Sequence, residues 1–347
     1  MKNFWKQLPK PFFVLAPMAN VTDAAFRRMI AKYGKPDVMY TEFVSADGLL
    51  RADAEGKAKL LRDLTFTEAE RPIVAQFFTS DLTAMENAAR IAAELGFDGI
   101  DINMGCPDRS IEKQGAGAKL MLNPERAQEL IAAAKRGAPN LPVSVKTRIG
   151  YNKDILEEWL PALLAAEPAA IVIHARTRKE MSKVPAHWER IARAVEIRNE
   201  MKSKTLIVGN GDCSGSEDAR VKAEETGADG VMLGRAFFGS PWLFKKEEGA
   251  GRSGFSPLQV ITGTLQKATS PRRPSPAVQL RIAVEHAKLF EESLGDIKSF
   301  SVMKKHFKAY VEGFKGAKEL RAQLMETENV AEVEKIIENF LQMTAEK

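Results

Sequence analysis

Cysteine is scarce in this sequence, with only Cys106 and Cys213 among 347 residues. Two cysteines exclude a disulfide framework and a zinc site built from cysteine alone. The four histidines are scattered along the chain, so no metal is expected. Long hydrophobic runs are also missing, and none approaches the roughly 18–20 residues of a membrane helix. These absences predict a cytoplasmic protein with no membrane partner.

Hydrophobic residues make up 44% of the chain and charged residues 28%, which is typical of a globular protein with a large core. The net charge of +5 is unevenly spread: residues 1–250 carry 36 basic and 34 acidic side chains, whereas residues 251–325 carry 13 and 6. Such a local excess favours a polyanionic partner, because lysine and arginine release counterions when they contact phosphates. A solvated helical surface would give the same pattern, so both interpretations stay open.

Short apolar segments alternate with amphipathic segments over the first 235 residues or so. Eight segments rich in Val, Ile and Phe predict strands: Phe12–Ala16, Val38–Glu42, Ile73–Phe77, Gly99–Asn103, Pro142–Thr147, Ala170–His174, Thr205–Gly209 and Gly230–Leu233. The segments between them predict helices, among them Asp23–Tyr33, Asp81–Leu95, Pro124–Lys135, Asp154–Ala166 and Ser216–Thr226. Eight βα units predict an α/β fold, a (β/α)8 TIM barrel, which we assign to residues 1–250.

The alternation stops at about residue 255. Apolar residues at three- and four-residue spacing then predict helices at Pro257–Lys267, Ala277–Leu294, Ile297–Phe314, Ala317–Thr327 and Val330–Met343. We therefore expect residues 251–347 to form a small all-α domain after the barrel.

Polar residues stand at nearly every predicted strand end, although the strand bodies are apolar. In a TIM barrel these carboxyl ends meet at one face, which carries the active site. The last two ends, with Gly209, Gly211, Gly234 and Arg235, suit a phosphate group, because glycine lets backbone N–H groups approach an anion.

Other strand ends suit a heterocyclic cofactor. Gln76 and Asn103 offer both donors and acceptors to a ring edge. Lys146 can hold the negative charge that develops on a reduced isoalloxazine, and His174 ends the neighbouring strand. An ion pair at the barrel mouth would equally explain Lys146, and a hydrogen-bonded core position would explain His174.

Cys106 lies between Gly105 and Pro107, in the loop after the fourth predicted strand. A thiol at the barrel mouth with an ordinary pKa near 8.5 is protonated at pH 7, so it can act as an acid or, once ionised, as a nucleophile. Arg109 is positioned in the sequence to lower that pKa. For Cys213, in the loop after the seventh strand, simple packing is the favoured interpretation.

Seven segments, most of them at these strand ends, resemble the tRNA-dihydrouridine synthases. They are Ala16–Asp23 (APMANVTD), Asn103–Pro107 (NMGCP), Gly115–Ala118 (GAGA), Val145–Arg148 (VKTR), His174–Arg178 (HARTR), Gly209–Asp212 (GNGD) and Leu233–Arg235 (LGR). In the tail, Met303–His306 (MKKH) and Gly313–Leu320 (GFKGAKEL) resemble the helical domain of that family. The NMGCP element is the most specific of these.

The resemblance implies an FMN-dependent oxidoreductase that uses NADPH to reduce the C5–C6 double bond of specific uridines in tRNA. Cys106 would be the general acid that protonates C5, while hydride passes from reduced FMN to C6. The cofactor residues would be Pro17, Met18 and Ala19 along the flavin, Gln76, Lys146 and His174 at its ring, and Asn210, Gly211, Asp212, Gly234 and Arg235 at its phosphate. Asn103, Arg176 and Arg178 would hold the uracil. Lys304, Lys305, His306 and Lys308 are the residues expected to contact tRNA phosphates.

One segment departs from the family pattern. After HARTR the family would place an aromatic residue and a glycine, whereas this chain has Met181–Trp188 (MSKVPAHW). Two alternatives also remain: an FMN barrel oxidoreductase for a small molecule, which would not need a basic tail, and a non-enzymatic RNA-binding protein, which would bind no flavin. A monomer is expected.

Overall fold

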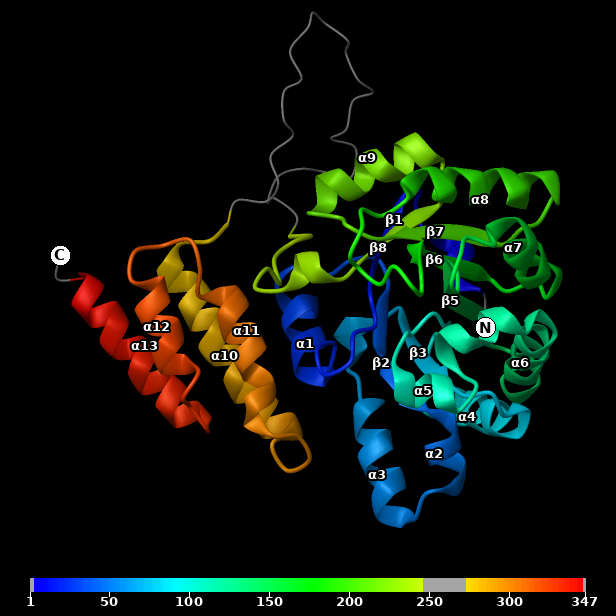
Figure 1. Cartoon of the computed structure of the whole chain (residues 1–347). Helices are drawn as coiled ribbons and strands as arrows, with labels where there is room; N and C mark the ends of the chain where they lie inside the picture. Colours follow the sequence, from blue (N-terminus) through cyan, green and yellow to red (C-terminus); the bar gives the residue numbers. More distant parts are fainter. Residues whose placement is uncertain (1–2, 246–272, 346–347) are drawn as a thin grey trace, which may run out of the picture.

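A sheet of eight parallel strands forms the centre of the computed structural model, which describes residues 3–245 and 273–345 (Figure 1). The strands are β1 Phe12–Leu15, β2 Met39–Ser45, β3 Ile73–Phe78, β4 Gly99–Met104, β5 Val143–Gly150, β6 Ala170–Thr177, β7 Leu206–Asn210 and β8 Gly230–Leu233. All eight predicted strands are confirmed, with ends that move by up to three residues. β1, β4 and β8 are buried along their whole length, as expected for strands covered on both faces.

The sheet curls into a nearly closed barrel. Its order is β1-β8-β7-β6-β5-β4-β3-β2, with every neighbouring pair parallel. β1 also meets the residue before β2: the N–H of Leu15 donates to the carbonyl oxygen of Val38 at 3.0 Å, and the N–H of Val38 donates to that of Phe13 at 3.1 Å. This arrangement brings the carboxyl ends of the strands to one rim, as a TIM barrel requires.

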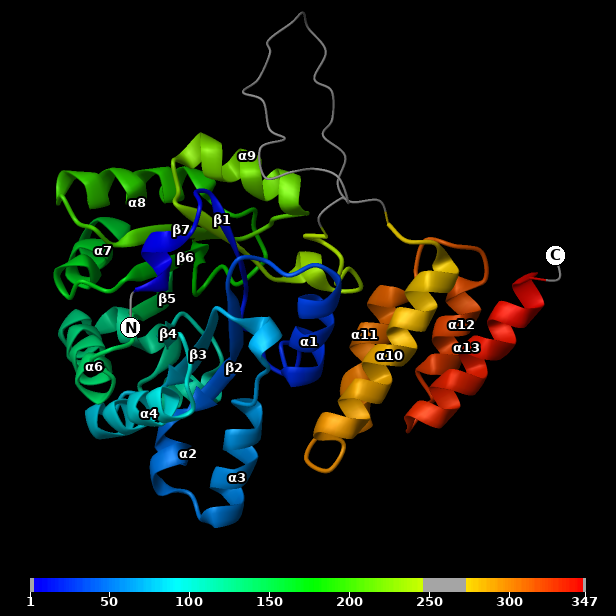
Figure 2. The ribbon, with the colours of Figure 1, turned by 180° about the vertical axis from the view of Figure 1, so that it is seen from behind.

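Helices connect the strands and cover the outside of the barrel (Figure 2). They are α1 Ala24–Tyr33, α2 Ala46–Arg51, α3 Ala54–Asp63, α4 Leu82–Glu94, α5 Arg109–Lys113, α6 Pro124–Gly137, α7 Leu156–Ala165, α8 Trp188–Glu200 and α9 Ser216–Thr226, with short 3-10 turns η1 Phe4–Gln7, η2 Glu68–Glu70, η3 Gly117–Leu122 and η4 Arg235–Phe237. Side-chain caps start several of them; Asp23, for example, accepts from the N–H of Phe26 at 2.9 Å. The short helices α2, α3 and α5 are additions to the simple alternation of one strand and one helix. They are not among the helices predicted from the sequence.

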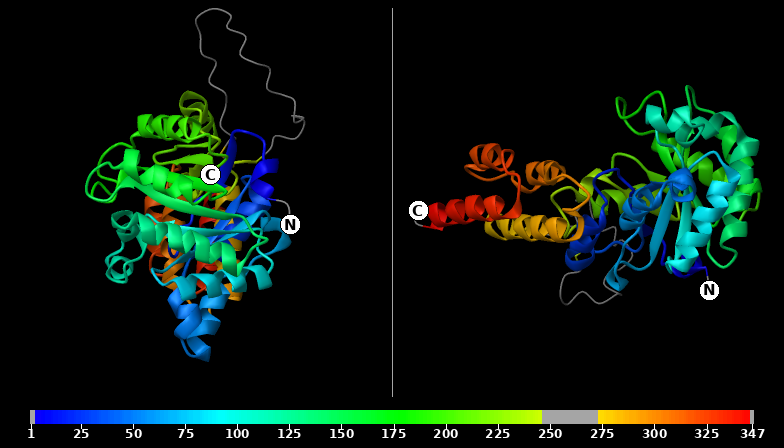
Figure 3. Two further views of the ribbon diagram at one scale, coloured as in Figure 1. Left: turned by 90° about the vertical axis from the view of Figure 1, so that its right-hand side faces the viewer. Right: turned by 90° about the horizontal axis from the view of Figure 1, so that it is seen from below.

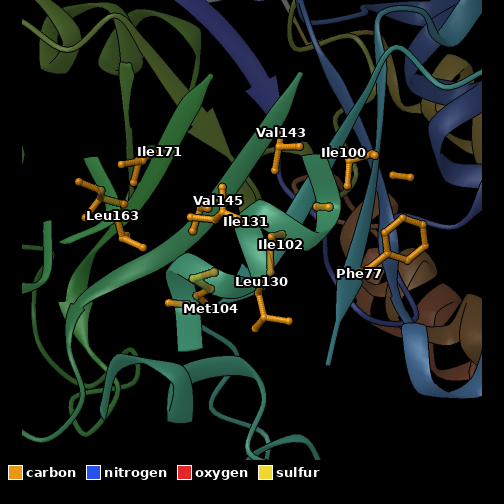
Figure 4. Packing of buried hydrophobic residues seen from close by; sticks show 14 of the residues in the cluster. Phe77, Ile100, Ile102, Met104, Leu130, Ile131, Val143, Val145, Leu163 and Ile171 are labelled. Atoms are coloured by element: carbon orange, nitrogen blue, oxygen red, sulfur yellow. The ribbon is translucent and has the colours of Figure 1, made fainter. Parts of the chain in front are cut away.

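The main hydrophobic core lies between the sheet and these helices. Figure 4 shows Ile100 and Ile102 of β4 beside Val143 and Val145 of β5, with Leu130 of α6 packed near them. A second cluster of buried apolar residues, most of them at alternate positions of the strands, fills the interior of the barrel. Its members are Trp5, Phe12, Val14, Ala16, Val38, Tyr40, Val74, Ala170, Val172, Leu206, Val208 and Met232. The barrel is therefore packed through its centre, and its rim is the place left for chemistry.

Four helices follow the barrel in the described part of the tail: α10 Pro276–Leu294, α11 Met303–Tyr310, α12 Ala317–Leu324 and α13 Val330–Ala345, with the turn η5 Phe300–Val302 before α11. The bounds of α10, α12 and α13 confirm three of the predicted helices to within three residues. The four helices share an apolar core of their own. Figure 3 shows α13 on the side of this group away from the barrel. No helix in the described ranges is both long and apolar enough to cross a membrane.

The helix predicted at Ile297–Phe314 is wrong in extent. The structure places η5 and the shorter α11 there, and α11 ends before Val311 because the chain then turns through Gly313 and Gly316, both at left-handed φ of 80° and 84°. The predicted helix Pro257–Lys267 and the division at residue 250 lie outside the described residues.

Helix α1 belongs to both cores. Phe26 and Ile30 pack against the barrel, whereas Ala25 and Met29 pack against the C-terminal helices. Helix α1 is therefore one of the elements through which the tail packs on the barrel.

Arg27 and Glu70 form a fully buried ion pair beneath α1. Arg27 Nε lies 2.7 Å from Glu70 Oε2, neither side chain is exposed, and Arg27 Nη1 donates to the carbonyl oxygen of Thr22 at 2.8 Å. We expect Arg27→Met to lower the free energy of unfolding by about 3–5 kcal/mol, because Glu70 is left as an unpaired buried charge. The double variant Arg27→Met/Glu70→Met should lose less than Arg27→Met alone. Urea unfolding of the three proteins measures this, and a double variant less stable than the single one would contradict it.

Candidate functional site

A cavity of about 650 Å³ opens at the carboxyl ends of β1, β5, β6, β7 and β8. Its wall consists of Ala16, Pro17, Met18, Lys146, His174, Arg176, Ser182, Asn210, Gly211, Asp212, Cys213, Ser214, Met232, Leu233, Gly234, Arg235 and Ala236. The structure thus brings together nine of the residues predicted for a cofactor and one of those predicted for the uracil. Ala19, Gln76, Asn103, Cys106 and Arg178 do not form part of this wall.

Two glycines let the cavity approach the backbone of the rim. Gly211 has φ of 132°, and a Cβ there would lie 2.8 Å from Ala186 and 3.3 Å from the ring of His174. A Cβ at Gly234 would lie 3.1 Å from the sulfur of Met18. Gly211 is therefore required both by space and by its backbone conformation, whereas a side chain at Gly234 would have to displace Met18.

Arg176 and Arg235 meet at Asp212, on the same side of the cavity. Asp212 Oδ2 accepts from Arg176 and from the N–H of Ala186 at 2.9 Å, while Oδ1 accepts from Arg235 at 2.7 Å. Although burial opposes it, these donors hold the pKa of Asp212 below its ordinary value. Arg235 remains 69% exposed, so its guanidinium can still turn toward an anion beside the two glycines.

Lys146 and His174 also line the cavity, and His174 Nε2 lies 3.3 Å from Arg176 Nη1. Burial, followed by repulsion from Arg148, lowers the pKa of Lys146 to about 8, and its Nζ donates to Asn210 Oδ1 at 3.3 Å. Burial, followed by repulsion from Arg148 and Lys146, holds the pKa of His174 far below its ordinary value. His174 is therefore a neutral ring, whereas Lys146 can gain or lose a proton near physiological pH.

Asn103 holds the loop after β4 that carries Cys106, and Gln76 supports the side chain of Asn103. Asn103 Oδ1 accepts from the backbone N–H groups of Gly105 (3.2 Å) and Cys106 (2.9 Å), and Asn103 Nδ2 donates to Gln76 Oε1 at 3.1 Å. Gln76 Nε2 in turn donates to Asp101 at 2.7 Å, a buried carboxyl whose pKa burial raises to about 6. Both amides are thus engaged within the protein, and the structure gives them a supporting role that the sequence pattern does not predict.

Cys106 is half-buried at the top of this chain of hydrogen bonds. Burial raises the pKa of its thiol, while Lys146 and Arg148 oppose that effect. Arg148 also donates through Nε to the carbonyl oxygen of Gly105 at 2.9 Å. The expected lowering by Arg109 is therefore not the net result: the thiol stays protonated at neutral pH, as an acid must.

Arg178 turns away from the cavity wall. Its Nε donates to Glu112 Oε1 at 2.8 Å, its Nη2 bonds Glu112 Oε2, and its guanidinium lies over the ring of Tyr151 at 5.0 Å. Of the three residues predicted for the uracil, only Arg176 lines the cavity.

The unusual Met181–Trp188 segment is built into the same rim. Ser182 lines the cavity, the N–H of Ala186 donates to Asp212, and Trp188 Nε1 donates to the carbonyl oxygen of Gly211 at 2.9 Å. Ser182, Ser214 and Cys213 are wall residues that sequence reasoning missed. Their position in loops after β6 and β7 was the available signal. Burial raises the pKa of Cys213 to about 12, so this thiol is not a nucleophile at neutral pH.

The four residues predicted for tRNA contact do not share one face. The prediction that His306 contacts tRNA is wrong, because its side chain is fully buried against Phe26 and His286 and offers no surface to RNA. Lys305 donates to the carbonyl oxygen of Asn20, and partial burial lowers its pKa. Lys308 is exposed and Lys304 partly so. In residues 3–245 and 273–345, no group of three or more His, Cys, Asp or Glu is placed to hold a metal ion.

Lys146 predicts a distinct pH dependence of stability in the protein without cofactor. Its pKa of about 8 lies below the ordinary 10.5, so the unfolded chain binds more protons between these values and the wild type gains stability across that window as pH rises. Lys146→Met removes this titration. Its stability relative to the wild type should therefore fall between pH 8 and 10.5, as measured by urea unfolding. A difference that does not change with pH would rule out the lowered pKa.

Comparison with known proteins adds to this geometry. The profile of the family described as "Dihydrouridine synthase (Dus)" matches residues 14–346. The "Probable tRNA-dihydrouridine synthase 2" of Bacillus subtilis (strain 168) is 40% identical over 341 residues, 98% of this chain and 97% of that protein. The "Probable tRNA-dihydrouridine synthase" of Staphylococcus aureus (strain COL) is 39% identical, over 98% of this chain and 96% of that protein.

Solved structures share the barrel at low identity. A 2-naphthoyl-CoA reductase in complex with 2-naphthoyl-CoA aligns with a TM-score of 0.51 at 12% identity, over 67% of this chain and 49% of that one. Histamine dehydrogenase from Rhizobium sp. 4-9 aligns with a TM-score of 0.50 at 13% identity, over 67% and 45%. These alignments span two thirds of this chain and about half of each solved structure, and they show a common fold alone. The family profile and the curated relatives, in contrast, match almost from end to end, and the chain therefore belongs to the dihydrouridine synthase family.

Proposed function

We propose that this protein is a tRNA-dihydrouridine synthase that binds FMN and uses NADPH to reduce the C5–C6 double bond of uridines in tRNA. The curated relatives carry the name of that activity, and family membership supports it. The observation that carries the proposal is the presence of two features at one rim: a cavity lined by basic residues and glycines, and the Cys106 loop that Asn103 and Arg148 hold there.

The cavity fits the phosphate end of a flavin nucleotide. Gly211 and Gly234 leave room that a Cβ would fill, and Arg235 brings positive charge beside them. Asp212 binds the guanidinium groups of Arg176 and Arg235, so positive charge is already gathered at the rim, and the exposed Arg235 can turn toward an anion. Asn210, Gly211, Asp212, Gly234 and Arg235 are therefore the residues we propose for the phosphate, as the sequence motifs predict.

Pro17, Met18, Lys146 and His174 would line the ring. Lys146 is largely buried, and in its protonated form it offers a positive charge where negative charge develops on reduction. His174 stays neutral, so its ring contributes hydrogen bonds without adding a second full charge. These residues would hold FMN, which when bound and reduced would supply the hydride for C6 of the uracil.

Cys106 is the proposed general acid. Its Sγ–H would donate the proton to C5, and the thiolate left behind would recover a proton from water. Asn103 holds the Cys106 N–H and Arg148 holds the Gly105 carbonyl, so the loop is fixed from both sides. A fixed donor loses little entropy on reaching the reacting geometry.

The uracil must reach the rim in an extruded form, because a base within folded RNA is stacked. Arg176 lies in the cavity wall and remains our candidate for the base. Arg178, paired with Glu112, would need to exchange that partner to touch it.

We also propose that the C-terminal helices bind tRNA by contacts with its phosphates. Lys304 and Lys308 are four residues apart on α11, so they lie on one side of that helix. His306 is excluded by burial, and Lys305 is engaged with the barrel.

Mass spectrometry of dihydrouridine-free tRNA incubated with the protein, FMN and NADPH tests the reaction. The wild type should add two hydrogens at a mapped uridine. Cys106→Ser should slow that step by roughly 10²–10⁴-fold, the usual contribution of a positioned acid. Its FMN affinity, measured by flavin fluorescence, serves as the control and should match the wild type. Flavin-loaded wild type that leaves tRNA unchanged would refute the proposal and favour a small-molecule reductase.

A substitution at Lys308 tests whether α11 contacts tRNA. Lys308→Ala should weaken tRNA binding and reduce the slope of log affinity against log salt by about 1, because one phosphate contact is lost. Lys335→Ala is the matched control, since it removes one exposed positive charge from α13. Filter binding across a salt series measures both. Equal effects from the two variants would show only a general charge effect.

A further inference from the structure

Glu42, in β2, uses its two carboxylate oxygens in different directions. Oε1 accepts a hydrogen bond from the backbone N–H of Asn20, in the loop between β1 and α1. Oε2 lies 2.6 Å from Nζ of Lys298, in the connection between α10 and η5. One carboxylate thus joins a loop of the barrel to a segment of the C-terminal helices 256 residues away in the sequence.

Asn20 is held on both sides of its backbone. Its N–H is bound to Glu42, and its carbonyl oxygen accepts from Nζ of Lys305 on α11. Its φ is 54°, in the left-handed region where asparagine is one of the few tolerated residues other than glycine. Two contacts from different parts of the molecule therefore fix an unusual backbone conformation.

The same loop forms part of the cavity. Pro17 and Met18 line it, and the sulfur of Met18 packs over Gly234. The N–H of Met18 donates to Thr22 Oγ1 at 2.9 Å, which closes the turn around Asn20. A displacement of Asn20 would therefore move Met18 relative to the cavity.

Lys298 is the cation that compensates this region. Its side chain is 14% exposed and that of Glu42 7%, and Lys298 Nζ also lies 2.8 Å from Asp63 Oδ1, at the end of α3. Burial alone would lower the pKa of Lys298, but Glu42 and Asp63 raise it above its ordinary value. Without this ammonium two acidic groups would face each other with little solvent, and Glu42 would lose the partner that orients it.

We propose that Lys298 is a positioning residue for the flavin cavity: acting through Glu42 and Asn20, it sets the β1–α1 loop that carries Met18. The C-terminal helices then complete the cofactor site in addition to facing tRNA. This inference rests on the proposed function, because it takes a flavin as the occupant of the cavity.

The full-length protein and FMN test this link. Lys298→Met should weaken FMN binding about tenfold, a typical coupling between linked sites. Lys32→Met is the matched control: Lys32 pairs with Glu285 at 2.6 Å and joins α1 to α10 without touching the cavity loop. We expect Lys32→Met to leave FMN affinity unchanged and Lys298→Arg to restore it. Flavin fluorescence gives the dissociation constant, and thermal unfolding reports the general stability of each variant.

Glu42→Gln keeps the inference testable if Lys298→Met does not fold. An amide oxygen can still accept from Asn20, but the charge attraction to Lys298 is lost, so FMN affinity should fall in the same direction. Unchanged FMN affinity in Lys298→Met, or equal losses in Lys298→Met and Lys32→Met, would overturn the link. If the wild type binds no FMN, the proposed function falls and this inference with it. If the wild type binds FMN but leaves tRNA unchanged, the proposed function alone fails, and the comparison of variants still decides the link.

Discussion

Positive charge gathered at the ends of two adjacent strands is the constraint on which the site depends. Lys146 and Arg148 are two residues apart on β5, and His174 and Arg176 are two residues apart on β6. Arg148 lies beside His174 in the register of the two strands. Because side chains two residues apart share a face of a strand, four basic groups are forced to one side of the sheet. Burial, followed by repulsion from positive neighbours, lowers the pKa of Lys146, Arg148 and His174.

The fold tolerates this cluster because acids are placed at its two edges. Asp212 binds Arg176 at the rim, and Asp101 lies buried below Lys146. The compensation is incomplete, so the cavity keeps a positive potential that an anion can relieve. Binding an anionic cofactor would therefore stabilise the folded protein as well as equip it for chemistry.

Most of the rim could be predicted from the sequence, because a strand end next to a glycine-rich turn is a local feature. Gly211 is found at the cavity wall for that reason, and Lys146 and His174 are polar residues that directly follow apolar strand segments of β5 and β6. The role of Gln76 could not be predicted in the same way. Its amide turns to Asp101, a carboxyl in the middle of the next strand, and no local pattern shows that a buried acid needs donors from its neighbour.

In the C-terminal helices the sequence does carry a local signal, but it indicates burial and not RNA contact. Met303, His306, Phe307 and Tyr310 follow the spacing of a buried helix face, and all four are buried. The basic excess of residues 251–325 likewise counts lysines that are engaged within the protein, since Lys298 neutralises Glu42 and Asp63, and Lys305 binds Asn20. Net charge therefore overstates the surface available to RNA. In this protein part of that charge fastens the helices to the barrel, close to the loop that lines the cavity.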